Sequence, residues 1–99
     1  MPLSVRHTKA ARRDLQAIWN YISTDNPPAA DGQLRRIAET IHLLANTPYM
    51  GRQRDELAVG LRSIPVGRYL VFFDFNDTTL RIVRVIYSAR DITPALFEP

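Results

Sequence analysis

The hydrophobic residues of this chain change their spacing near its midpoint, and that change constrains the fold more than any other feature. In the first half, apolar residues recur every three or four positions, as they do along one face of a helix. In the second half they form short continuous runs separated by turn residues, which is typical of buried strands. The chain has 99 residues and no linker-like or repeated segment. We therefore expect residues 1–99 to form a single domain in which helices pack on a sheet.

Two amphipathic helices are expected in the first half, after a short strand over residues 3–7. Thr8 is a suitable N-cap for the first helix, and Asn26 followed by Pro27 caps and starts the second. Pro48 ends the second helix. The predicted apolar faces comprise Ala11, Leu15, Ile18 and Ile22 in the first helix, and Ala30, Leu34, Ile37, Ile41 and Leu44 in the second. A tight turn between the two helices predicts an antiparallel helical hairpin.

Three strands are expected in the second half. Residues 61–66 favour an edge strand, because the proline among them has no N–H to donate to an inner ladder. Residues 69–75 and 80–87 predict a hairpin that is apolar on both faces, so both faces should be at least partly covered. Leu96 and Phe97 in the tail are candidates to pack back on the core. The order β-α-α-β-β-β predicts an α+β fold, a small antiparallel sheet with the helical hairpin packed on one face.

The composition excludes several kinds of site. The chain has no cysteine, so it has no disulfide, no thiolate zinc site and no thiol nucleophile. His7 and His42 are its only histidines, which excludes a histidine-rich metal site. We expect no metal and no cofactor. No apolar run reaches the length of a membrane helix, and residues 1–4 do not begin a signal peptide, so we expect a cytoplasmic protein without a membrane partner.

The positive charges are nearly all arginines. The net charge is +3 and the pI is about 9.8, which is less basic than a protein that coats DNA. Twelve of the thirteen basic residues are arginine, which favours bidentate recognition of anions, although a GC-rich genome produces the same bias. Residues 51–90 contain seven arginines and four carboxylates. This excess suggests a basic sheet edge that meets RNA phosphate or an acidic protein segment, or else a solvated face with balanced charges.

Arg84 is the most constrained of these arginines. It lies between Val83 and Val85 in the most apolar part of the chain, where a charge must be paired or must face a cleft. An ion pair with Asp74 across the hairpin is one interpretation and a cleft position is the other.

The residues alone do not favour an enzyme. A nuclease without a metal needs a base, an acid and cations around the phosphate. The cations are present, but the acid or base candidates are limited to Glu56, His42 and Tyr87, and no two of them show a spacing that argues for a pair. There is no glycine-rich phosphate loop, metal motif or nucleophile elbow. Trp19 and Tyr21 flank the apolar face of the first helix. An aromatic residue at this position is more often a core residue than a contact residue, so we favour the core interpretation over the contact one.

Several segments together resemble ParE-type toxins of the RelE/ParE superfamily. The resemblance covers essentially the whole chain in the right order, and the superfamily has the β-α-α-β-β-β order inferred above. The matching segments are residues 11–22, Asn26-Pro27-Pro28-Ala29-Ala30, Pro48-Tyr49-Met50-Gly51-Arg52, Glu56-Leu57, Gly60-Leu61-Arg62-Ser63, residues 67–73 and residues 84–92.

The resemblance implies a toxin of a type II toxin–antitoxin system that inhibits DNA gyrase, blocks replication and needs no cofactor. It also implies a hetero-oligomer with a ParD-like antitoxin, whose own N-terminal part binds operator DNA, so that the toxin reaches this DNA only indirectly. We expect the antitoxin groove along the helical hairpin and the exposed sheet edge, near Leu15, Trp19 and Ile22. The candidates for contact with gyrase are the C-terminal segment and the arginines of the sheet edge, Arg62, Arg68, Arg84 and Arg90.

Two alternatives remain open. RelE-like relatives cut mRNA on the ribosome, and here Arg62, Arg84 and Tyr87 would then stabilise and protonate the reacting phosphate. Tyr87 stands where ParE-type chains usually carry histidine, and tyrosine is an acid or base type seen in RelE. The segments Gly-Leu-Arg-Ser and Ala-Arg-Asp-Ile are typical of the ParE branch, which we therefore favour. The other alternative is a non-toxic module that only binds an antitoxin.

Overall fold

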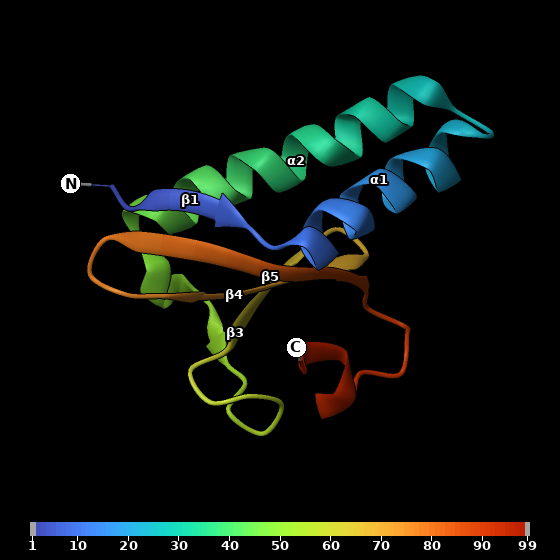
Figure 1. Ribbon diagram of the computed structural model, residues 1–99. Helices are drawn as coiled ribbons and strands as arrows, with labels where there is room; N and C mark the ends of the chain where they lie inside the picture. The colour runs from blue at the N-terminus through green and yellow to red at the C-terminus, as the bar shows by residue number, and fades with distance from the viewer. Residues whose placement is uncertain (1, 99) are drawn as a thin grey trace.

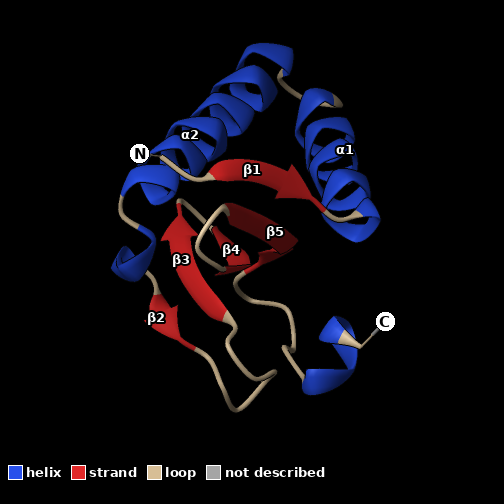
Figure 2. Cartoon of the chain, turned by 60° about the vertical axis from the view of Figure 1, so that its left-hand side comes forward, coloured by secondary structure: helices blue, strands red, loops and turns tan. Residues whose placement is uncertain are grey.

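A computed structural model describes residues 2–98 as two helices packed on a five-stranded sheet (Figures 1 and 2). The strands are β1 (Ser4–His7), β2 (Arg52–Gln53), β3 (Arg62–Val66), β4 (Tyr69–Phe75) and β5 (Thr79–Tyr87), and the helices are α1 (Lys9–Ser23) and α2 (Pro27–Asn46). There are also two short 3-10 helices: η1 (Pro48–Met50) follows α2, and η2 (Pro94–Phe97) lies in the C-terminal tail. The order across the sheet is β1-β5-β4-β3-β2. This is the predicted α+β architecture.

Both predicted N-caps are confirmed. The Thr8 hydroxyl oxygen accepts a hydrogen bond from the backbone N–H of Ala11 at 3.0 Å, and its O–H donates to the carbonyl of Val83 at 2.7 Å. Thr8 therefore both starts α1 and fixes that start against β5. The Asn26 side chain accepts from the backbone N–H of Ala29 at 3.1 Å. Neither these helices nor any other within residues 2–98 is long and apolar enough to cross a membrane.

The sheet differs from the prediction at both of its edges. It is mostly antiparallel, but β1 lies parallel to β5, with Ser4 opposite Thr79. The alternating pattern that predicts β1 is local and carries no information about the partner strand. At the other edge, β3 is not the outermost strand, because β2 pairs with Arg62 and Ser63. Pro65 lies beyond the end of β2, where its missing N–H costs no hydrogen bond to β2.

A β-bulge explains how β5 is apolar on both faces. Phe72 pairs with Arg84 and Phe73 pairs with Ile82, so Val83 is one extra residue in β5. Because of this extra residue, the side chains that follow Val83 point to the opposite face from the one that strict alternation would give.

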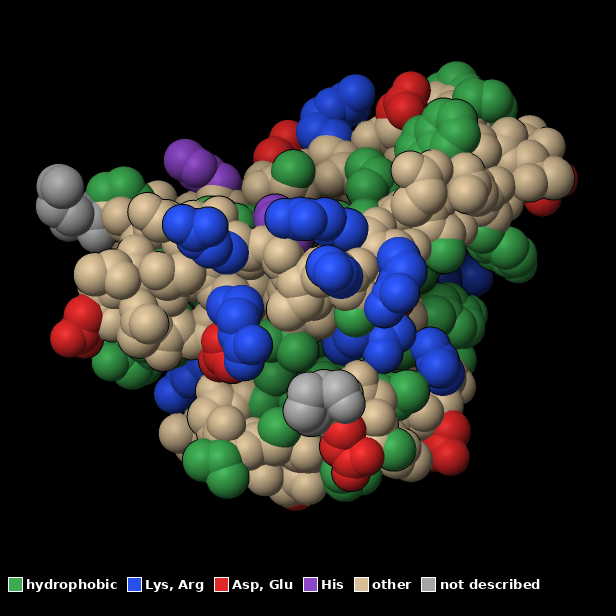
Figure 3. Space-filling view, in the orientation of Figure 1, with side chains coloured by type: hydrophobic (Ala, Val, Ile, Leu, Met, Phe, Trp, Pro, Cys, Tyr) green, Lys and Arg blue, Asp and Glu red, His purple; other side chains and the backbone are tan. Residues whose placement is uncertain are grey.

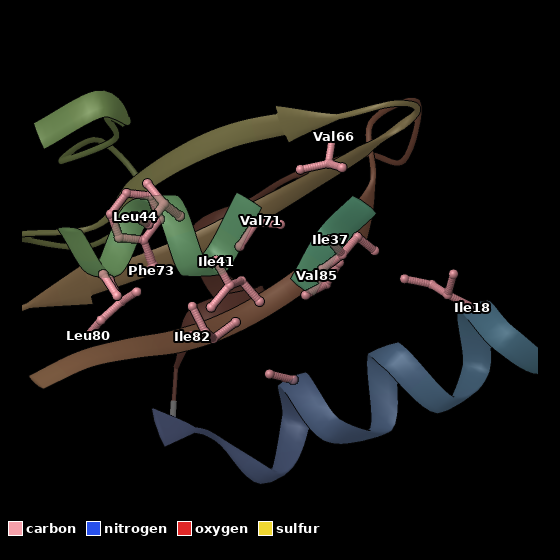
Figure 4. Close-up of a cluster of buried hydrophobic side chains, with 12 residues drawn as sticks. Ile18, Ile37, Ile41, Leu44, Val66, Val71, Phe73, Leu80, Ile82 and Val85 are labelled. Carbon is pink, nitrogen blue, oxygen red and sulfur yellow. The ribbon is translucent and has the colours of Figure 1, made fainter. Parts of the chain in front are cut away.

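Two hydrophobic clusters cover the two faces of the sheet, as predicted. The larger lies under the helices and includes Ile37, Leu44, Phe73 and Ile82, all almost completely buried (Figure 4). The smaller lies on the opposite face and contains Leu57, Leu61, Phe72 and Ile86, with Leu96 and Phe97 packed against it. The ring centroids of Phe97 and Phe72 are 4.7 Å apart. The predicted return of the tail to the core is therefore confirmed.

Candidate functional site

A cleft of about 770 Å³ lies beside α1. Four segments that are distant in sequence form its walls: the middle of α1, the first half of α2, the turn between β3 and β4, and the end of β5 with the turn that follows. We call it the arginine–tyrosine cleft. Its polar and aromatic lining residues are Asp14, Tyr21, Gln33, Arg36, Arg68, Tyr69, Tyr87 and Arg90, and Ile18, Ile22 and Val85 are among its apolar ones.

One wall of the cleft follows directly from the helical period of α1. Asp14, Ile18 and Tyr21 are spaced by four and three residues, so their side chains lie along one face of the helix. Ile18 belongs to the core, whereas Tyr21 is 79% exposed. The interpretation of Tyr21 as a core residue is therefore wrong. Tyr21 nevertheless lines the cleft, and the end of α1 to which it belongs extends past the sheet (Figure 1).

A buried amide positions Arg36 in the second wall. Gln33 is only 6% exposed, and its side-chain N–H₂ donates to the carbonyl of Val66 at the end of β3, at 3.4 Å. The Gln33 oxygen accepts a hydrogen bond from Arg36 Nη2 at 2.6 Å. Gly67 lies in the tight turn after β3 and has a φ of +59°, a conformation that favours glycine. This turn lies against the Gln33 side chain. Gln33 thus links α2, β3 and one guanidinium of the cleft.

Two tyrosines occupy facing positions on neighbouring strands. Tyr69 is directly opposite Tyr87, and their ring centroids are 5.8 Å apart in an edge-to-face arrangement. Burial raises the pKa of the Tyr69 hydroxyl, and the neighbouring Tyr21 and Tyr87 raise it further. The Tyr69 hydroxyl therefore remains protonated at neutral pH. Tyr87 is 44% exposed, so part of its ring is accessible from the solvent.

Arg68 and Arg90 are brought together by a hydrogen bond between their turns. The backbone N–H of Ser88 donates to the carbonyl of Arg68 at 2.8 Å, and the N–H of Arg90 donates to the carbonyl of Tyr87 at 3.0 Å. Both arginines are exposed, and neither forms an ion pair within residues 2–98. Of the four arginines proposed for target contact, these two line the cleft.

Arg84 is paired, but its partner is not the predicted one. Its Nε and Nη2 donate to the two carboxylate oxygens of Asp14 at 2.7 and 2.9 Å, and its Nη1 donates to the carbonyl of Leu96 at 3.1 Å. The Asp14 carboxylate also accepts from the backbone N–H of Val85 at 2.9 Å. The predicted partner, Asp74, instead binds Arg81, which stands directly opposite it in the sheet. Arg84 does not line the arginine–tyrosine cleft.

Arg62 lies away from the cleft, near the opposite end of the sheet. It pairs with Phe73 on β4, whereas Tyr69 and Tyr87 form the pair at the other end of the same strands. Arg62 Nη1 donates to the carbonyl of Gly51 at 2.7 Å, and its guanidinium lies 5.3 Å from the ring centre of Tyr49. The structure therefore does not bring Arg62, Arg84 and Tyr87 together.

The three residues expected near the antitoxin groove lie on different surfaces. Leu15 lines a second, smaller concavity of about 320 Å³ between β1, α1 and α2, which we call the helix–strand groove. This groove is lined by Val5, His7, Leu15, Leu34, Ile37, Ala38, Ile41 and His42. Ile22 lines the arginine–tyrosine cleft instead. Trp19 lines neither, is 36% exposed and donates its indole N–H to Asp31 at 3.0 Å.

Sequence reasoning identified only part of the cleft. Arg68, Tyr87 and Arg90 were recognised as site candidates, but Gln33 and Arg36 were not. The available signal was their spacing of three residues on α2, which places both on one helical face. That signal is weak, because polar residues at this spacing also occur on solvated faces. Within residues 2–98, no group of three or more His, Asp and Glu side chains is arranged to hold a metal ion.

Comparison with known proteins decides the family. Residues 5–92 match the family of "ParE toxin of type II toxin-antitoxin system, parDE". The chain belongs to the ParE toxin family. It is a toxin of a ParDE-type type II toxin–antitoxin system, as the resemblance implied. Toxin ParE3 of Caulobacter vibrioides is 30% identical over 93 residues, which cover 93% of each chain. Toxin ParE1 of the same organism is 30% identical over 86 residues, covering 85% of this chain and 88% of ParE1.

Solved structures share the fold of this ParE-family chain. A chain from the chromosomal ParDE system of P. aeruginosa superposes with a TM-score of 0.72 at 23% identity, covering 86% of this chain and 95% of that one. A chain from the toxin–antitoxin complex RelBE2 of Mycobacterium tuberculosis gives a TM-score of 0.63 at 32% identity, covering 88% of this chain and 99% of that one. The predicted RelE/ParE-like architecture is confirmed.

Proposed function

We propose that this ParE-family toxin inhibits DNA gyrase as a protein inhibitor and so blocks replication. The observation that carries the proposal is the engagement of Arg62 and Arg84 in contacts within the chain. Arg84 is held by Asp14, and Arg62 is held by the Gly51 carbonyl near the other end of the sheet. A nuclease that needs both guanidiniums beside Tyr87 would have to break these contacts. An inhibitor needs only exposed contact residues, and Arg68 and Arg90 meet that requirement.

A supercoiling assay tests this proposal. Purified toxin should inhibit gyrase in a concentration-dependent way, and Arg68→Gln together with Arg90→Gln should weaken the inhibition. Arg52→Gln is the matched control, because Arg52 is exposed on β2, outside the cleft. Gyrase that keeps its full activity in a stoichiometric excess of folded toxin would contradict the proposal.

A ribosome-dependent endoribonuclease is the second candidate function. Two observations favour it: Tyr87 is 44% exposed in a cleft with three arginines, and the chain is 32% identical to a RelBE2 chain. In this case toxin added to a translating extract should cleave mRNA, and Tyr87→Phe should abolish the cleavage because it removes the phenolic O–H. Intact mRNA together with inhibited gyrase would exclude this candidate.

We also propose that a ParD-like antitoxin binds the helix–strand groove and forms a hetero-oligomer with the toxin. The groove is lined mostly by apolar side chains and lies along the helical hairpin, so it suits the apolar side of a segment that folds on binding. A peptide from the antitoxin encoded beside the toxin should raise the melting temperature of the toxin. Leu15→Glu should prevent this shift, whereas Leu43→Glu, on an exposed part of α2, should preserve it. Normal growth on expression of the toxin alone would instead indicate a non-toxic module.

A further inference from the structure

We propose that the arginine–tyrosine cleft binds a nucleoside phosphate, either as a free nucleotide or as a unit of a single-stranded nucleic acid. This inference concerns the toxin chain itself and does not depend on gyrase being its target. The three groups that such a ligand requires meet in the cleft: cations for phosphate, ring faces for a base, and an apolar floor.

The cleft is electropositive because the carboxylate that lines it is paired with an arginine outside the cleft. Arg36, Arg68 and Arg90 line it, and Asp14 is the carboxylate among its lining residues. Both Asp14 oxygens accept hydrogen bonds from Arg84, which neutralises the carboxylate. Arg36, Arg68 and Arg90 come from three separate segments, and none of them forms an ion pair within residues 2–98. Guanidinium groups recognise phosphate oxygens through paired N–H donors.

Arg36 is also held in place before any ligand arrives. Its contact with the buried Gln33 at 2.6 Å fixes one edge of the guanidinium. An arginine that is already oriented loses less side-chain entropy when it binds an anion. Lys and Arg side chains also gather across the middle of the face shown in Figure 3. Among the described residues, Arg36 is the arginine whose guanidinium donates to a buried side-chain amide.

The aromatic rings favour a nucleoside over an acidic peptide. Tyr21 is 79% exposed and Tyr87 is 44% exposed, so both offer ring surface to a ligand. Stacking of a base on such a ring contributes affinity and tolerates any base. Ile18, Ile22 and Val85 also line the cleft and supply apolar surface. The volume of about 770 Å³ lies within the range of about 300–1,000 Å³ that is typical of small-ligand sites.

Binding of a fluorescent oligothymidylate to the full-length toxin, followed by anisotropy, tests the proposal. The affinity should fall with salt, with a log–log slope of about −2 if all three arginines contact phosphates. Arg68→Gln should reduce the slope by about 0.7, whereas the charge-matched Arg52→Gln should leave both the slope and the affinity unchanged. Tyr21→Ala should weaken binding by about tenfold, as expected for the loss of one stacked base.

Competition distinguishes the two sources of the ligand. Displacement of the oligonucleotide by thymidine monophosphate at comparable concentrations would identify a free-nucleotide site. Displacement only by longer strands would identify a single-stranded nucleic acid site. Equal losses in Arg68→Gln and Arg52→Gln would show non-specific attraction and overturn the proposal. Tighter binding of polyglutamate than of the oligonucleotide would overturn it in favour of an acidic peptide.

Discussion

At the scale of single residues, Asp14 joins more of the molecule than any other polar side chain of the cleft. Its carboxylate accepts hydrogen bonds from the Arg84 guanidinium and from the backbone N–H of Val85, beyond the point where β1 stops pairing with β5. Arg84 in turn donates to the carbonyl of Leu96 in the tail. The Asp14–Arg84 pair therefore connects α1, β5 and η2.

Replacing Asp14 by asparagine should lower the free energy of unfolding by about 2–3 kcal/mol, because it leaves the Arg84 guanidinium without a counter-ion. The two side chains are only 14% and 17% exposed, so water compensates little. Asp77→Asn, in the exposed turn between β4 and β5, is the matched control and should cost less than about 0.5 kcal/mol. Urea unfolding of the three proteins measures both values, and equal midpoints for the two variants would contradict this role of Asp14.

Substitution of glycine by alanine should have opposite effects on stability at Gly51 and Gly32. A Cβ at Gly51 would collide with the ring of the buried Phe73 and lie 3.2 Å from the carbonyl of Ser63. Gly51→Ala should therefore destabilise the fold by about 1–3 kcal/mol. A Cβ at Gly32, inside α2, meets no atom within 4 Å, so Gly32→Ala should stabilise the fold by up to about 1 kcal/mol. Thermal unfolding monitored by circular dichroism measures both, and a stable Gly51→Ala protein would refute the collision.

At the scale of elements, local patterns determined what could be predicted. The two helices could be predicted because their capping residues and apolar faces lie within the helical segments themselves. The strands β4 and β5 could be predicted because each contains a run of apolar residues. The parallel pairing of β1 was not predictable, because no residue of Ser4–His7 identifies its partner strand. The same reason explains the error over Arg84, whose partner Asp14 is 70 positions away. Contacts that depend on the packing of distant elements leave no local signal.

The tail helps to cover the second face of the sheet, together with Leu57 and Leu61. Phe97 packs its ring on the buried Phe72, while the helices cover the other face (Figure 2). Phe97→Ala should lower the free energy of unfolding by about 2 kcal/mol, because the ring is only partly buried. Phe72→Ala, at a fully buried position, should cost about 3–5 kcal/mol. Chemical denaturation measures the two losses, and an unchanged midpoint for Phe97→Ala would mean that the tail does not stabilise the sheet.

At the scale of the whole molecule, two concavities flank α1 and differ in chemistry. The arginine–tyrosine cleft gathers charges and rings from four distant segments, so the sequence could identify its members only one at a time. The helix–strand groove is lined mostly by apolar residues, and His7 and His42 are its titratable groups. The backbone N–H of Leu3 donates to the carbonyl of Ala45 at 2.8 Å, which ties the segment before β1 to the end of α2 beside this groove.

Protonation of His7 should destabilise the folded chain. Burial lowers the pKa of His7 below its ordinary value, and the positive charge of Arg12 lowers it further. The unfolded chain then binds a proton more readily than the folded one, so the free energy of unfolding should decrease as the pH falls below about 6.5. His7→Gln should remove this part of the pH dependence, because glutamine does not titrate. His42→Gln, at an exposed position of the same groove, should retain it. Urea unfolding between about pH 5 and 8 measures the difference, and parallel curves for wild type and His7→Gln would assign the dependence to other groups.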